Sequence, residues 1–158
     1  MGKGQAMIKF GSIQEILAFA VNKEEASYLF YTDMARMTED KTVSRFFEDF
    51  AKEELSHREQ LQLEIMKTGK VVSTDDDWSD RTRAEYTVEG EFPEDFSYAD
   101  VLKLAIAKES AAFKLYIDLL RITEDQEAID MFTALAEEEV RHKIKLESAY
   151  ETYMHQQH

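Results

Sequence analysis

Two groups of glutamate and histidine residues recur in this chain with the same internal spacing. Each group has one Glu and, about thirty residues later, a Glu-x-x-His motif, and corresponding residues of the two groups are 85 positions apart. The groups are Glu24, Glu54 and His57, and then Glu109, Glu139 and His142. A Glu-x-x-His pair on a helix points both side chains to one face, and helical bundles hold pairs of metal ions with such residues. The spacing therefore indicates metal binding.

These groups belong to an internal repeat, in which residues 12–61 align without a gap with residues 97–146. The identities extend beyond the acidic residues. They include Lys23/Lys108, Tyr31/Tyr116, Arg36/Arg121, Phe47/Phe132 and Ala51/Ala136. A duplicated half-site is the simplest explanation of this pattern.

Each repeat is predicted to form an antiparallel pair of helices. All five glycines and the single proline lie outside the repeats, and the apolar residues inside them recur every three or four positions. Capping boxes are expected where Ser12 and Ser97 begin the first helix of each pair, and Asp40 and Asp125 are expected to cap the second. The predicted fold is all-α: a four-helix bundle in one domain, residues 1–158, made of two repeated antiparallel hairpins, 12–66 and 97–152.

A long crossover, residues 67–96, is predicted to connect the hairpins. This segment lacks helical periodicity and contains Trp78 and Phe92. We expect both aromatic residues to pack against the bundle or against another subunit.

The candidate ligands lie on the apolar face of each predicted helix. Glu24 and Glu54 are equally far in sequence from residue 39, so an antiparallel hairpin places them at the same height. Burying carboxylates without positive charge costs several kcal/mol each, and these apolar faces contain no Lys or Arg. Four carboxylates and two neutral imidazoles are balanced by two divalent cations, so the pattern favours a dinuclear site.

The charge and the residue composition of the chain exclude or disfavour several kinds of binding partner and site. The formal net charge of −14 and the pI of about 4.7 disfavour binding to nucleic acid or to anionic membranes. The absence of Cys excludes disulfides, thiolate zinc sites and iron–sulfur centres. There is no apolar run long enough to span a membrane, and a soluble, cytoplasmic protein is expected.

On these residues the chain resembles the ferritin-like di-iron carboxylate proteins, and within them the rubrerythrins. The resemblance implies two non-haem iron ions, with manganese as an alternative metal. It implies that Glu54 and Glu139 bridge the metals, that Glu24 and Glu109 are terminal ligands, and that His57 and His142 each bind one metal. It also suggests that the hydroxyls of Tyr31 and Tyr116 bond a ligand carboxylate, with a purely packing role as the alternative.

Glu53 and Glu138 directly precede the two bridging residues. They are candidates to accept the imidazole N–H of the opposite hairpin, a common way of orienting a metal-bound ring. The alternative is that both belong to a solvated acidic surface.

The chain departs from rubrerythrins in two respects. Many of these have a further Glu where this chain has Ala112, with Ser27 at the equivalent place of the first repeat, and most carry a Cys-rich rubredoxin module. The residue after Glu54 is Leu55, where bacterioferritins have a haem-binding Met, so a haem-bearing cage is disfavoured.

The predicted function is therefore that of a rubrerythrin-like peroxidase, an oxidoreductase. It would reduce hydrogen peroxide, or dioxygen, with electrons from an external donor such as a rubredoxin-type protein. A homodimer is expected from the resemblance. The alternatives are a ferritin-type protein that oxidises and sequesters iron, and a helical bundle without catalytic activity.

Overall fold

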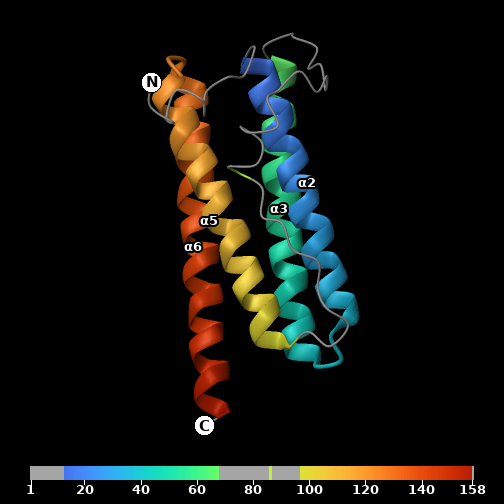
Figure 1. Ribbon diagram of the computed structural model, residues 1–158. Coiled ribbons are helices and arrows are strands. Elements are labelled where there is room, and N and C mark those ends of the chain that lie inside the picture. The colour runs from blue at the N-terminus through green and yellow to red at the C-terminus, as the bar shows by residue number, and fades with distance from the viewer. Residues whose placement is uncertain (1–12, 68–85, 87–96, 158) are drawn as a thin grey trace. The chain divides into compact units, whose positions relative to one another are not determined.

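The computed structural model describes residues 13–67, 86 and 97–157, and four helices account for nearly all of them. The helices are α2 (Ile13–Met37), α3 (Lys41–Lys67), α5 (Tyr98–Ile122) and α6 (Gln126–Gln156) (Figure 1). Within these described ranges there is no β-strand. The prediction of an all-α protein is confirmed.

The first hairpin consists of α2 and α3, which pack against each other. The short turn after α2 ends at Asp40, whose Oδ1 accepts hydrogen bonds from the backbone N–H groups of Thr42 and Val43 at 2.8 and 3.2 Å. These donors lie in the first turn of α3 and have no partner within the helix, so the carboxylate stabilises its start. The predicted cap at Asp40 is confirmed.

The second hairpin consists of α5 and α6 and begins with a capping box. Ser97 Oγ accepts from the backbone N–H of Asp100, and Asp100 Oδ2 accepts from the backbone N–H of Ser97, both at 3.2 Å. The backbone bond from Ser97 is the main reason that the pKa of Asp100 is lowered. Asp125 caps α6 by accepting from the N–H of Ala128 at 3.1 Å. Both predicted caps are present.

Equivalent aromatic residues form the core of each hairpin. Tyr31 stacks on Phe47 with ring centroids 6.1 Å apart, and Tyr116 stacks on Phe132 at 6.2 Å. All four rings are buried, as are Leu61 and Leu146, which occupy corresponding positions. Each such side chain contributes about 1.5–3 kcal/mol by leaving water. The repeat seen in the sequence is therefore also a repeat of packing.

Tyr86 lies between α3 and α5 in the sequence, and its side chain contacts α5. Its hydroxyl donates a 2.8 Å hydrogen bond to Asp118 Oδ2, and Lys114 Nζ lies 5.5 Å from the centre of its ring. The ring is buried, with 1% of its surface exposed. The predictions made for Ser12, Trp78 and Phe92 lie outside the described residues.

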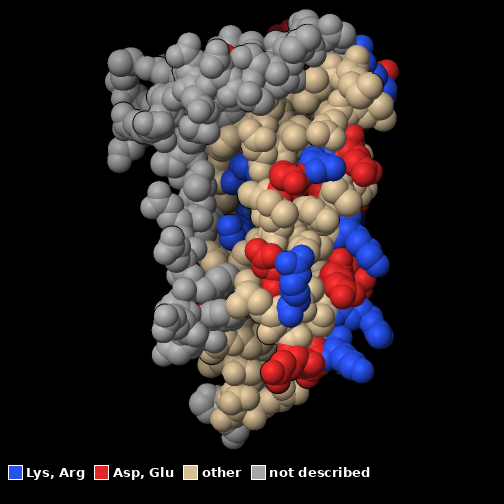
Figure 2. Space-filling model, turned by 90° about the vertical axis from the view of Figure 1, so that its right-hand side faces the viewer, with Lys and Arg blue, Asp and Glu red and all other residues tan. Residues whose placement is uncertain are grey.

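The helices form two compact units, α2 with α3 and α5 with α6. The expectation of a single domain stays a prediction. On the described part of the face seen in Figure 2, acidic and basic side chains are interspersed. This described part of the face therefore shows no extended basic patch of the kind typical of nucleic-acid binding. None of the four helices is long and apolar enough to cross a membrane.

Candidate metal centre

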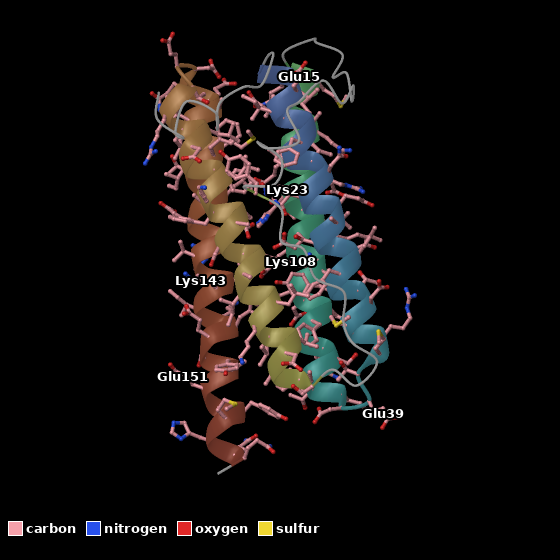
Figure 3. All side chains as sticks on the ribbon, viewed as in Figure 1. Glu15, Lys23, Glu39, Lys108, Lys143 and Glu151 are labelled. Carbon is pink, nitrogen blue, oxygen red and sulfur yellow. The ribbon has the colours of Figure 1, made fainter. Side chains whose placement is uncertain are left out.

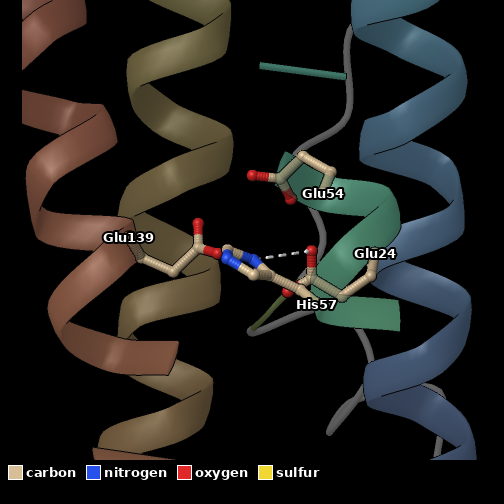
Figure 4. Close-up of side chains that lie close together, drawn as sticks. All are labelled: Glu24, Glu54, His57 and Glu139. Atoms are coloured by element: carbon tan, nitrogen blue, oxygen red, sulfur yellow. Dashed lines mark ion pairs between the residues drawn. The ribbon is translucent and has the colours of Figure 1, made fainter. Parts of the chain in front are cut away.

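The first hairpin brings its three predicted ligands together. Glu24 comes from α2, and Glu54 and His57 come from one turn of α3; 2% or less of each residue is exposed. One donor atom from each of the three lies within 4.8 Å of the others. His57 Nδ1 is 3.5 Å from Glu24 Oε2, and Figure 4 shows this pair with Glu54 beside it. We call these three residues triad one.

The second hairpin repeats this arrangement with Glu109 from α5 and with Glu139 and His142 from α6. These residues are also at most 2% exposed, and their donor atoms again lie within 4.8 Å of one another. His142 Nδ1 is 3.5 Å from Glu109 Oε1, the same separation as in triad one. We call these residues triad two. The two repeats thus share the geometry of their donor atoms as well as the residue types.

Helical periodicity explains why these polar groups are inside. On α3, Phe47, Phe50 and Leu61 are buried on the face that also carries Glu54 and His57. Residues three, four and seven positions apart share one side of a helix, so burying the apolar residues also buries the ligands. On α6, Phe132, Leu135 and Leu146 are buried in the same way on the face that carries Glu139 and His142.

The chemistry of the donor set fits a metal ion. Each triad offers two carboxylates and one imidazole, a combination that suits Fe(II) and Mn(II). Buried carboxylates are costly unless positive charge compensates them, and a bound cation supplies that charge. The structure thus places all six predicted ligands in two buried clusters, while metal binding by them stays a prediction.

A lysine directly precedes the first glutamate of each triad. Lys23 Nζ lies 5.7 Å from the centre of the Phe19 ring on the same helix. Lys108 directly precedes Glu109, and burial lowers the pKa of its ammonium group. Figure 3 labels both lysines on their helices.

The residues suggested to support the ligands fall into two classes. Tyr31 and Tyr116 are buried in the aromatic cores, which confirms their packing role; a hydrogen bond from either hydroxyl to a ligand stays a prediction. Glu53 is exposed, and the side chain of Glu138 is 37% exposed with Arg141 Nη2 3.5 Å away. Acceptance of an imidazole N–H by Glu53 or Glu138 also stays a prediction.

One contact beside triad one was missed by the sequence analysis. Arg58 Nη1 on α3 donates a close hydrogen bond to Glu25 Oε2 on α2, forming an ion pair between the helices. Glu25 directly follows the ligand Glu24, and Arg58 directly follows the ligand His57. These opposite charges next to two predicted ligands were the signal that could have revealed the pair.

Comparison of the sequence with known protein families identifies the family of this chain. The sequence model of the rubrerythrins matches residues 15–150, which contain both triads. The chain belongs to the rubrerythrin family. A search of curated protein sequences found no match.

Solved structures share the fold of this rubrerythrin-family chain. A hypothetical protein from Pyrococcus furiosus is 21% identical with a TM-score of 0.76, covering 94% of this chain and 96% of its own. A dodecameric thioferritin from Bacteroides fragilis, described as bacterioferritin-related, is 23% identical with a TM-score of 0.75, covering 98% and 92%. A manganese catalase from Anabaena is 18% identical with a TM-score of 0.66, covering 92% and 76%. These similarities confirm the ferritin-like helical bundle.

Proposed function

We propose that this protein is a non-haem di-iron oxidoreductase in which triads one and two together bind two metal ions. The observation that carries the proposal is the presence of the same buried carboxylate and histidine cluster in both repeats. Membership of the rubrerythrin family supports it, because the matched region includes all six residues.

Charge balance supports two divalent ions. Four buried glutamates carry four negative charges if all are ionised, and two neutral imidazoles add none. Two M²⁺ ions neutralise this set, whereas one ion leaves two buried charges uncompensated. Iron is the metal we propose. Manganese stays the alternative, since both ions accept mixed oxygen and nitrogen ligands and a similar fold occurs in a manganese catalase.

The residues of the chain have distinct roles in this proposal. Glu54 and Glu139 would be shared by the two ions, Glu24 and Glu109 would be terminal ligands of one ion each, and each histidine would supply one nitrogen ligand. Because less than 3% of each ligand is exposed, the triads exclude bulk water from the reacting atoms. Tyr31 and Tyr116 would orient ligand carboxylates through their hydroxyls.

Peroxide is the oxidant that we propose, with dioxygen as the alternative. When bound, two Fe(II) ions supply the two electrons that, with two protons, reduce hydrogen peroxide to two molecules of water, and an external donor restores both electrons. The donor would be a separate rubredoxin-type protein, because these 158 residues contain no Cys to hold a comparable iron centre. We propose a homodimer as the working assembly.

A ferritin-type function is the second candidate. The fold similarity to a protein described as a dodecameric thioferritin favours it, because storage requires a shell of many subunits. Light scattering on the purified protein separates the two candidates. A dimer supports the oxidoreductase, and a large hollow assembly that takes up many irons per chain would replace it with storage.

The experiment that tests the proposal is metal analysis followed by kinetics. Protein purified without oxygen should contain about two irons per chain, and a Glu54→Ala, Glu139→Ala double variant should lose them. Stopped-flow mixing should then show faster oxidation of the reduced protein by hydrogen peroxide than by air-saturated buffer. Absence of bound metal in the wild type would refute the di-iron function, and equal rates would refute the preference for peroxide.

A further inference from the structure

The two triads have the same internal geometry but different surroundings. In both, the imidazole Nδ1 lies 3.5 Å from the first glutamate of the triad. Next to triad one, the ion pair between Glu25 and Arg58 joins α2 to α3. The corresponding residues next to triad two are Ser110 and Lys143, so the carboxylate of this pair is missing from the second repeat.

The position of the ion pair gives it influence over the ligands. Glu25 and Arg58 are each the next residue in the sequence after a ligand of triad one. Their side chains are 38% and 27% exposed, so solvent screens the pair only in part. Arginine presents a rigid planar donor group that holds a carboxylate in a defined geometry, which lysine does not do. The pair therefore links α2 to α3 at the height of triad one.

We propose that Glu25 and Arg58 are positioning residues that make triad one the tighter of two unequal metal half-sites, so that it is occupied first. This inference rests on the proposed binding of metal by the triads. A site whose ligands are already held in place loses less conformational freedom when it binds, and so binds more tightly.

Charge acts in the same direction as positioning. Beside triad one, the positive charge of Arg58 is balanced by Glu25. Beside triad two, Lys143 brings a positive charge, and Ser110 offers no carboxylate to balance it. Figure 3 labels Lys143 on α6. A positive charge without a carboxylate at position 110 disfavours the binding of M²⁺ in triad two.

The expected difference in metal affinity between the two half-sites is small because Glu25 and Arg58 act on the ligands indirectly. Removing a group that bonds a metal ligand directly costs about 10–100-fold in metal affinity. Glu25 and Arg58 act through the helix backbone instead, so we expect the affinities of the two half-sites to differ by about three- to tenfold.

The test measures each half-site separately with Co(II) under anaerobic conditions, by absorbance titration and by calorimetry. His142→Ala leaves triad one intact, and His57→Ala leaves triad two intact. We expect His142→Ala to bind its first Co(II) about three- to tenfold more tightly than His57→Ala. Adding Glu25→Gln to His142→Ala breaks the ion pair and leaves Arg58 without its carboxylate, so it should abolish this advantage. A companion variant, Lys143→Met added to His57→Ala, removes the cation beside triad two and should raise the affinity of that triad for Co(II) slightly.

A gain of affinity provides the reverse test. Ser110→Glu together with Lys143→Arg builds the missing ion pair into the second repeat, and in the His57→Ala background it should tighten Co(II) binding by about the same factor. Equal affinities of the two single-histidine variants would overturn the inference while leaving the di-iron proposal intact, as would a swap that fails to tighten binding. Failure of the wild type to bind Co(II) at all would instead count against the di-iron proposal itself.

Discussion

Replacing Glu54 with Gln should have opposite effects on stability with and without metal. Glu54 is completely buried, and Gln keeps its shape without its charge. Replacing a buried ion pair with well-packed uncharged residues of similar volume is often neutral or stabilising by about 1–4 kcal/mol, and for this single charge we expect about 1–2 kcal/mol because the amide is still polar. For a chain of this size, each kcal/mol raises Tm by about 2–4 °C, so the variant without metal should melt about 2–8 °C above the wild type.

With metal bound, we expect the wild type to melt at a higher temperature than Glu54→Gln. A ligand at one hundred times its Kd stabilises the native state by about 2.7 kcal/mol per site, and Glu54→Gln removes a ligand that the proposal assigns to both ions. Calorimetric melting in excess chelator and in saturating Mn(II) measures both effects. Glu59→Gln is the matched control, because Glu59 lies on the same helix but is exposed. If Glu54→Gln instead lowers Tm in chelator, Glu54 stabilises the fold without metal, and burial of its charge is not the cost that metal binding offsets.

Two further predictions concern stability alone. Tyr86→Phe removes the hydroxyl that donates to Asp118 and should cost about 1.5–3 kcal/mol, measured by urea unfolding; a loss below about 0.5 kcal/mol would contradict the importance of this bond. Asp125→Ala removes the cap of α6 and should cost about 0.5–2 kcal/mol, whereas Asp125→Asn, which can still accept from the N–H of Ala128, should retain most of the stability.

The parts of the fold that could be predicted depend on local chemistry or on periodicity. A cap needs only a short side chain and the next backbone N–H groups, so Asp40, Ser97 and Asp125 were identifiable within a few residues of sequence. The triads were identifiable because helical spacing decides which side of a helix a residue occupies. The duplication made both inferences stronger, since each pattern occurred twice.

The contacts that escaped prediction join residues through tertiary packing. Tyr86 and Asp118 are 32 positions apart, and no periodic pattern connects them, so only the folded chain shows that they bond. Arg58 and Glu25 are 33 positions apart and belong to the first repeat alone. A comparison of the two repeats reveals only the residues that they share. Glu25 and Arg58 correspond to Ser110 and Lys143 in the second repeat, so this comparison could not reveal their ion pair.

The apolar residues around the triads explain how one chain can hold costly polar groups and still fold. On α3, Phe47 and Phe50 precede the polar layer of triad one by about one to two turns, and Leu61 follows it by about one turn; all three are at most 2% exposed. These layers exclude water from both sides and thereby strengthen the attraction of each carboxylate for a cation. Moving a ligand by one position would turn its side chain by about 100°, away from this layer. The apolar pattern that stabilises the hairpin therefore also fixes which residues can bind metal.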